Sequence, residues 1–270
     1  MEYNKVLALA FLLSCAIGDT VAGEISLRLS GGTKVESNKE EFGKVLMVHG
    51  NGFSCTAYAV SETAIITAAS CFDSQDGNFD SISIMEHTRT NVIVHEDYNK
   101  DLPGNNIAII TIESMGFEDN IILASEDTKS GTNCRVTGYG ETGDDGSTLM
   151  TAYYENVTVM GCTNKETPYI CAGVTDDNNN YHGIVCTGDI GAPLVCNNQL
   201  VGIAVRGNSC GSETDPDEYQ KIKDVKDWIE THIYNLSTSS TDSTAMDTTA
   251  SANLLIFNYF VFLLTLKVIF

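Results

Sequence analysis

Residues 54–71 read SCTAYAVSETAIITAASC. This stretch holds two short runs of apolar and β-branched residues, at positions 56–60 and 64–68, and a polar turn separates them. Runs of this length and composition between turn residues are typical of β-strands. The stretch therefore predicts two short strands that follow one another in the chain.

The same pattern continues on both sides of this stretch. Further short runs, divided by Gly, Asn and Asp, cover residues 45–48, 82–85, 91–94, 107–112, 135–137, 153–159, 193–196 and 200–205. Strands of this length and spacing predict an all-β sandwich or barrel. Only near the end of the pattern do apolar residues lie three or four positions apart, which predicts one face of a helix: Ile222, Val225, Trp228, Ile229 and Ile233.

Composition excludes some classes of function. The chain has 270 residues, of which 36 are acidic and 15 basic, so its formal charge is −21. A surface with this much negative charge repels phosphate, which argues against nucleic acid and anionic lipid as partners. The hydrophobic share of 43% is ordinary for a globular chain and excludes disorder throughout.

Residues 1–23 have the layout of a secretory signal peptide. Lys5 precedes an apolar run over residues 6–17, and small residues follow at 21–23. A membrane-spanning helix is the alternative, but it requires about 20 apolar residues, more than this run contains. We therefore expect residues 1–23 to be cleaved from an exported chain.

The other end of the chain has the layout of a glycolipid-anchor signal. Residues 236–253 are small and polar, with attachment expected at Ser243, and residues 254–270 form an apolar tail. An ordinary spanning helix is the alternative, although Asn258 and Lys267 lie within the tail. These features predict a protein of the secretory pathway that is displayed on the outer face of the plasma membrane, with shedding as a further option.

Cysteine usage agrees with export. Of the nine cysteines, Cys15 lies in the signal peptide and eight remain. Exported chains meet an oxidising compartment, so four disulfides are expected, although spacing alone leaves 105 possible connectivities. Sequons begin at Asn156 and Asn235, which are candidate sites of N-glycosylation.

Seven segments resemble, in order, the trypsin/chymotrypsin family of serine proteases. Besides residues 54–71 they are NNIAIITI (105–112), CRVTGYG (134–140), ICAG (170–173), CTGDIGAPLVC (186–196), VGIAVRGNSCG (201–211) and the closing helix around Trp228. The resemblance implies an all-β fold of two six-stranded antiparallel β-barrels with a C-terminal helix, formed by residues 29–235. The active site of the family lies in the cleft between the barrels, and residues 24–28 would be a short pro-segment.

The disulfide pattern of the family implies four pairs in this chain. They are Cys55–Cys71, Cys134–Cys196, Cys162–Cys171 and Cys186–Cys210. The loop that the third pair closes is shorter than usual in the family.

The resemblance also locates the positions that carry catalysis in the family. Peptide cleavage there needs a Ser nucleophile, a His that takes its proton and an Asp that orients the His. The corresponding positions hold Ile190, Ser70 and Asn106. The backbone amides of Gly188 and Ile190 remain as a relic of the oxyanion hole. We therefore expect a catalytically inactive serine protease homologue and not an enzyme.

Asp189 is retained from the family's pattern. In the family this carboxylate pairs with the amine that is exposed when the pro-segment is cut after a basic residue. Cleavage after Arg28 would free Leu29 for this role. The alternative is that Glu24 remains the N-terminus and that backbone donors satisfy Asp189.

Three positions of the specificity pocket depart from the family. Ile184 stands where trypsin-like enzymes keep an acidic base, Arg206 replaces an aromatic residue, and Asp217 replaces a glycine. We expect a pocket that is either occluded or closed by an Arg206–Asp217 ion pair. Neutral drift on an unused surface is the alternative.

These departures favour binding over catalysis. The expected partner is a protease, an inhibitor or a protease substrate, held by the old cleft as a decoy or co-receptor, and the negative charge favours a basic partner. No cofactor is expected, and no metal either, because the acidic clusters at residues 73–80 and 176–180 lack the spacing of a calcium loop.

Two other functions stay open. One is a structural or adhesive surface domain. The other is a serine endopeptidase with residual or relocated activity, which would need one of the five histidines as its base: His49, His87, His95, His182 or His232.

Overall fold

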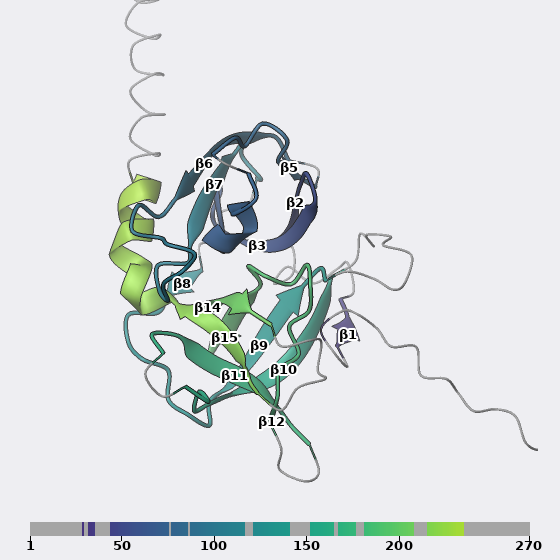
Figure 1. Cartoon of the computed structure of the whole chain (residues 1–270), viewed down its shortest axis with the longest axis vertical. Coiled ribbons are helices and arrows are strands. Elements are labelled where there is room, and N and C mark those ends of the chain that lie inside the picture. The colour runs from purple at the N-terminus through teal and green to yellow at the C-terminus, as the bar shows by residue number, and fades with distance from the viewer. Residues whose placement is uncertain are drawn as a thin grey trace, which may run out of the picture.

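The structure is a computed structural model that describes residues 29, 32–35, 44–75, 77–85, 87–116, 121–140, 152–164, 167–176, 181–207 and 215–234. Several sequence predictions lie outside these residues: the signal peptide, the 24–28 segment, the stalk with Ser243, the apolar tail, Cys210 and Asn235. Within the described part, two strand-built units lie against each other and a helix flanks them (Figure 1).

The first unit is an antiparallel sheet of six strands, paired in the order β5-β2-β3-β4-β7-β6. The strands are β2 (Val45–Gly50), β3 (Phe53–Ser61), β4 (Ala64–Thr67), β5 (Ser83–Ile84), β6 (Arg89–Val94) and β7 (Ala108–Ile112). The sheet curls around apolar side chains from its strands, among them Val48, Ile66 and Ile109, which are fully buried. This burial is the main stabilising contribution to the unit.

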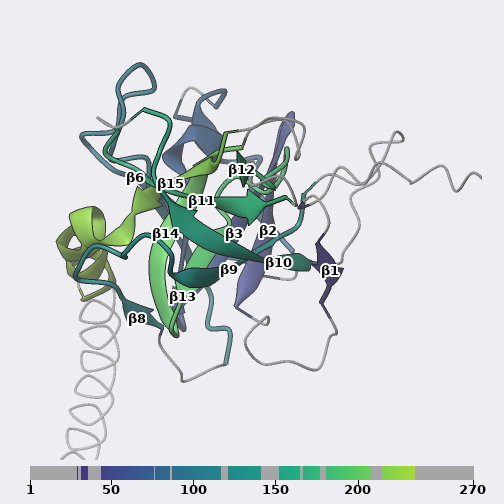
Figure 2. The ribbon, with the colours of Figure 1, turned by 90° about the horizontal axis from the view of Figure 1, so that it is seen from below.

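The second unit is a closed barrel of six antiparallel strands, because β10 pairs with β11 as well as with β9. Its strands are β9 (Asn133–Gly138), β10 (Tyr153–Met160), β11 (Ile170–Thr175), β13 (Pro193–Cys196), β14 (Gln199–Arg206) and β15 (Asp217–Lys221). Three short strands extend it: β1 (Thr33–Lys34) on β10, β8 (Ile122–Leu123) on β14 and β12 (Tyr181–His182) on β11. Figure 2 shows β1 beside β10 and β12 beside β11.

The predicted fold class is confirmed, with one difference in detail. The second unit closes into a six-stranded barrel, whereas the pairings of the first six-stranded sheet run from β5 to β6 without closing among the described residues. The apolar runs did not reveal β15, whose sequence is DEYQK. Asp217 and Gln220 are buried on opposite faces of this strand, so polar residues interrupt the apolar pattern on both faces.

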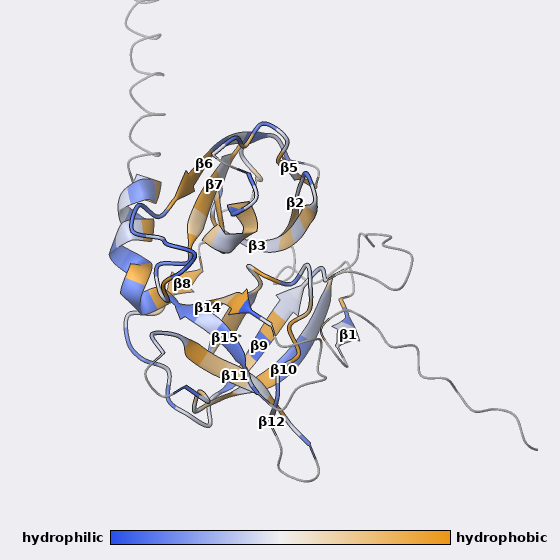
Figure 3. Cartoon of the chain, in the orientation of Figure 1, coloured by the Kyte–Doolittle hydropathy of each residue, from blue (hydrophilic) through white to orange (hydrophobic). Residues whose placement is uncertain are grey.

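The C-terminal helix, which covers residues 222–234 of the described chain, joins the two units. It follows β15 of the barrel, yet its buried residues Ile222, Val225 and Ile229 belong to the apolar core that centres on the first sheet. Trp228 Nε1 also donates to Glu96 Oε2 at 2.7 Å, in the loop after β6. Figure 3 shows hydrophobic residues gathered on the strands and hydrophilic ones on the loops and along much of the helix.

Three of the implied disulfides are present: Cys55–Cys71, Cys134–Cys196 and Cys162–Cys171. Cys186 is also disulfide-bonded, while Cys210, its implied partner, is outside the described residues. In the part of the chain that the structure describes, no helix has the length and apolar character needed to cross a bilayer.

Candidate functional site

A cleft of about 370 Å³ lies where the first sheet faces the barrel. Ser70 and Asn106 line it from the first unit, while Tyr169, Arg206 and Glu218 line it from the barrel. The structure therefore brings two of the three degenerate triad positions to one hollow, together with one residue of the altered specificity pocket.

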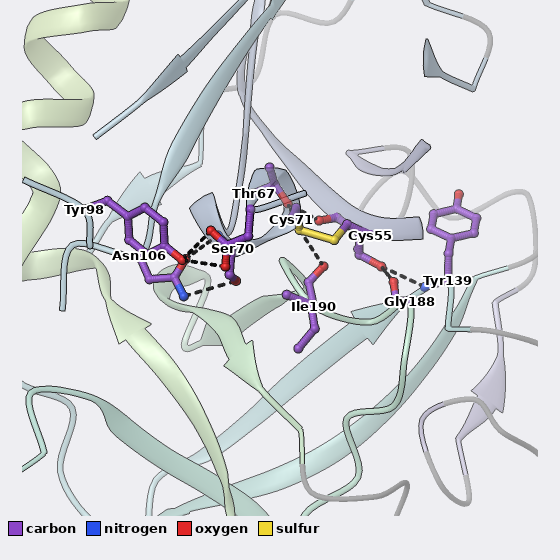
Figure 4. The surroundings of a disulfide bond; sticks show 11 residues. Cys55, Thr67, Ser70, Cys71, Tyr98, Asn106, Tyr139, Gly188 and Ile190 are labelled. Atoms are coloured by element: carbon purple, nitrogen blue, oxygen red, sulfur yellow. Dashed lines mark hydrogen bonds between the residues drawn. A yellow bond between two sulfur atoms is a disulfide. The ribbon is translucent and has the colours of Figure 1, made fainter. Parts of the chain in front are cut away.

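Ser70 and Asn106 bind each other (Figure 4). Ser70 lies on the 3-10 turn η2 (Ala69–Phe72), and its backbone N–H donates to Asn106 Oδ1 at 2.9 Å. Asn106 Nδ2 donates to Ser70 Oγ at 3.2 Å, so the two polar side chains satisfy each other. A hydroxyl and an amide accept no proton near neutral pH, so this pair offers no general base.

Ile190 lies in the turn between Cys186 and β13. Its side chain is half-buried and packs against the apolar cores of both units, and its carbonyl accepts the backbone N–H of Thr56 at 2.8 Å. A hydrocarbon at this position has no atom for acyl transfer. Gly188 has φ +88, a left-handed conformation that glycine adopts without strain, so the turn before Ile190 forms without backbone strain at this position.

Thr56 ties this turn to the first sheet, a role that the sequence did not indicate. Its buried hydroxyl donates to the carbonyl of Gly188 at 2.9 Å and accepts the backbone N–H of Tyr139 at 3.0 Å. Thr67 Oγ1 in turn donates to the Thr56 carbonyl at 2.7 Å. A threonine in a strand is ordinary, because β-branched residues favour strands, so no signal in the sequence marked this one.

Asp189 is fully buried and its carboxylate accepts three backbone N–H groups. Gly140 donates to Oδ1 at 2.7 Å, Cys186 donates to Oδ2 at 3.1 Å, and Leu29, itself buried, is the third donor. Burial raises the pKa of this carboxyl to about 7, against the opposing effect of the hydrogen bonds.

The two glycines of the segment CRVTGYG are required by this carboxylate. A Cβ at Gly138 would lie 2.1 Å from Asp189 Oδ1, and one at Gly140 would lie 2.6 Å from Oδ2. No side chain fits at either position without moving the carboxylate. The segment at the end of β9 is therefore shaped around Asp189.

The predicted ion pair between Arg206 and Asp217 is wrong. The Arg206 guanidinium is exposed and lies 3.8 Å from Glu218, its cross-strand neighbour. Asp217 is fully buried, because successive strand residues face opposite sides, and its carboxylate accepts the backbone N–H groups of Ile184 and Val185, the latter at 2.9 Å. Asp217 thus binds the backbone at the base of the pocket from inside, and the occluded pocket stays a prediction.

Tyrosines shape the rim of the cleft, and the sequence had not singled them out. Tyr98 OH donates to the Asp73 carboxylate at 3.0 Å, and burial raises the pKa of this phenol above its ordinary value. Tyr169 OH accepts the backbone N–H of Gly104 at 2.9 Å. These bonds hold the loop after β6 and the segment before β11 against the cleft.

Histidines occupy other parts of the described chain. His95 stacks on Trp228 with ring centroids 4.7 Å apart, and His182 Nε2 lies 3.2 Å from Asp176. None of the cleft-lining residues that the structure describes is a histidine. Among all the residues that the structure describes, no group of three or more His, Cys, Asp or Glu could hold a metal ion.

Two strand-built units that meet at a cleft, one of them a closed β-barrel, with a buried aspartate in the turn before β13, are typical of trypsin-like serine proteases. A family model described as Trypsin matches residues 29–229. The chain therefore belongs to the trypsin family.

Individual relatives agree with this assignment. Trypsin epsilon of Drosophila erecta is 28% identical over 255 residues, which cover 84% of this chain and 97% of the relative. The anionic trypsin of Canis lupus familiaris is also 28% identical, over 85% of this chain and 98% of its own. The structure of neuropsin, a serine protease expressed in the limbic system of mouse brain, matches with a TM-score of 0.59 at 22% identity, covering 74% of this chain and 98% of neuropsin, and shows the shared fold.

Thr56→Val tests the link between the two units. The change keeps the shape of the side chain but leaves the Gly188 carbonyl and the Tyr139 N–H without their partner, so we expect the free energy of unfolding to fall by about 1–3 kcal/mol. Chemical denaturation measures it, with the exposed Thr63→Val as the matched control, expected to change stability by less than about 0.5 kcal/mol. Equal effects of the two changes would contradict the role of Thr56.

Asp189 should make stability depend on pH. The folded chain keeps this proton up to about pH 7, whereas an unfolded carboxyl releases it near its ordinary value of 3.8. The contribution of Asp189 is therefore complete below that lower value and is lost as the pH rises through about 7. Relative to Asp189→Asn, the wild-type free energy of unfolding should fall between about pH 4 and pH 7 in denaturation experiments and stay level above that range.

Two controls belong to this measurement. Asp101→Asn removes an exposed carboxylate and should keep the wild-type slope. A chain cut after Arg28 should lose the slope, because the new amine would keep Asp189 charged, and N-terminal sequencing identifies which form is present. Identical slopes in wild type and Asp189→Asn would show that Asp189 is not the titrating group.

Proposed function

We propose that this chain is a catalytically inactive member of the trypsin family that works by binding. It is displayed on the outer face of the plasma membrane by a glycolipid anchor, and it holds a protease, an inhibitor or a protease substrate through the old cleft, as a decoy or co-receptor. One observation carries the proposal: the three positions of the catalytic triad hold Ser70, Asn106 and Ile190, of which the first two bind each other in the cleft.

The chemistry supports the loss of activity. Loss of the nucleophile alone removes on the order of 10⁶ in turnover, and an amide in place of the orienting carboxylate removes about 10⁴. The backbone amides of Gly188 and Ile190 can offer at most weak stabilisation of an oxyanion, without a nucleophile to generate it. An occluded specificity pocket would add to this, and the buried Asp217, which binds the N–H groups of Ile184 and Val185, supports it.

The position of Leu29 supports cleavage after Arg28. Leu29 is buried with its backbone N–H against the Asp189 carboxylate, which is where a new amine would have to lie. Cleavage would replace an N–H donor by a charged amine and strengthen this contact. The turn that contains Gly188 and Ile190 would then be ordered for binding and not for catalysis.

The charge of the chain supports a basic partner. The net charge of −21 attracts cations over distances of about the Debye length, roughly 8–10 Å at ordinary ionic strength. At the cleft itself, three carboxylates outnumber two cations: the carboxylates are Asp73, Asp101 and Glu218, and the cations are Lys100 and Arg206, which lies beside Glu218. A basic surface would therefore be drawn to this side of the molecule.

Restoring the triad tests the loss of catalysis. The wild-type ectodomain should show no labelling by a fluorophosphonate and cleave no peptide of a broad panel, whereas the variant with Ser70→His, Asn106→Asp and Ile190→Ser should be labelled, because the probe needs only an activated serine. The matched control carries the first two changes with Ile190→Ala and should stay unlabelled. Wild-type turnover that disappears when one of its own residues is changed would overturn the proposal.

Partner binding should depend on salt and on the cleft. Proximity labelling on intact cells, with and without phospholipase release, identifies candidate partners, which are then purified. Association should slow by about tenfold or more from low to high ionic strength. Asp101→Asn and Glu218→Gln, which remove carboxylates of the cleft, should weaken binding of a basic partner, while Asp127→Asn, which lies outside the cleft, should not. Binding that ignores salt would refute the electrostatic part, and binding that ignores the two cleft variants would favour an adhesive domain.

A further inference from the structure

A second hollow, of about 490 Å³, lies away from the cleft and shares no lining residue with it. We call it the asparagine groove. Apolar or aromatic side chains contribute one part of its lining, and side-chain amides contribute another: the first are Val45, Tyr58, Ile121, Pro193 and Val195, and the second are Asn133, Asn156, Asn197 and Asn198. Lys44 and Arg135 add two cations to the lining, and no carboxylate is among the described residues that line it.

One of these amides is the acceptor of a sequon. Asn156 begins Asn156-Val157-Thr158 and lies in the middle of β10, where its side chain is exposed. Sequons are usually found in surface loops, so a strand is an unusual place. The strand holds Asn156 in a set position, opposite Arg135 on β9, and Thr158 Oγ1 donates to Asn133 Oδ1 at 3.3 Å on the same pair of strands.

We propose that Asn156 carries an N-linked glycan and that its first sugars lie in the asparagine groove and cover it. The chain of sugars starts at a side chain that already forms part of the lining, so the groove is the nearest surface available to it. A strand limits the directions in which the linkage can point, because its backbone is fixed by pairing on the barrel.

The chemistry of the lining suits this occupant. A pyranose ring offers an apolar face of C–H groups and a rim of hydroxyl and acetamido groups, and the groove offers apolar side chains beside amides that both donate and accept. The first sugars of an N-glycan are uncharged, which suits a lining without carboxylates. The glycan would thus cover Ile121 and Val195, the half-buried apolar residues of the lining.

This proposal depends on export of the chain and not on the loss of catalysis or on the cleft partner. It predicts that the asparagine groove is closed to other ligands in the mature protein. A partner that binds the chain would then use the cleft or another surface, and not this groove.

Dye binding tests whether the glycan covers the groove. The full chain is produced in secreting cells, and mass spectrometry measures the occupancy of Asn156. The fluorescence of anilinonaphthalene sulfonate, whose apolar rings and anionic sulfonate suit the apolar residues and the two cations of the groove, should be low with wild type and rise several-fold with Asn156→Gln or Thr158→Ala. Thr158→Ser keeps the sequon and should behave as wild type, and Asn235→Gln removes the other sequon and should change nothing. An unoccupied Asn156, or equal dye binding by wild type and Asn156→Gln, overturns the proposal.

Enzymatic release of the glycan gives a second measurement. Peptide-N-glycosidase should free Asn156 at least tenfold more slowly from the folded chain than from the denatured chain. Ile121→Trp places an indole in the groove, so it should displace the sugars and speed release from the folded chain. Ile122→Trp changes the neighbouring residue, which is 61% exposed and outside the groove, and should leave release slow. Equal rates for these two variants would show that the sugars lie elsewhere.

Discussion

The rest of the structure depends on one buried charge-bearing group, the carboxylate of Asp189. It accepts backbone N–H groups from Leu29, from Gly140 at the end of β9 and from Cys186 at the start of the turn that carries Ile190. Three separate parts of the chain are thereby held together by one side chain. A buried carboxylate is costly unless such donors surround it, so each donor segment has to keep its place.

This arrangement does not involve the residues that would perform catalysis. The donors to Asp189 are backbone groups, and the hydroxyl of Thr56 likewise binds the carbonyl of Gly188 and the N–H of Tyr139. A change of side chain at Ser70 or Asn106 therefore leaves the hydrogen bonds of Asp189 and Thr56 in place. The cleft between the two units holds a hydroxyl from Ser70 and an amide from Asn106.

The cleft and the asparagine groove differ in the chemistry of the residues that line them. The cleft combines carboxylates, Arg206 and two bonded tyrosines, Tyr98 and Tyr169, which suits a polar protein surface. The asparagine groove has amides and apolar side chains without a carboxylate, and it contains a sequon asparagine. A glycan over the asparagine groove would leave the cleft accessible. The proposed glycan would therefore favour binding of the partner at the cleft.

Local pattern in the sequence was enough for the all-β class, the final helix and, with the resemblance, the trypsin family and three disulfides. The all-β class and the helix follow from residue periodicity, whereas the family and the disulfide pairing follow from the resemblance, since spacing alone left 105 connectivities and Cys134 and Cys196 are 62 residues apart. Only the tertiary structure decided that Arg206 faces Glu218 and that Asp217 turns inward to bind Ile184, because strand register and alternation determine which side chains meet. The role of Thr56 and the shaping of Gly138 around Asp189 were also beyond the sequence, since those contacts join residues that are far apart in the chain.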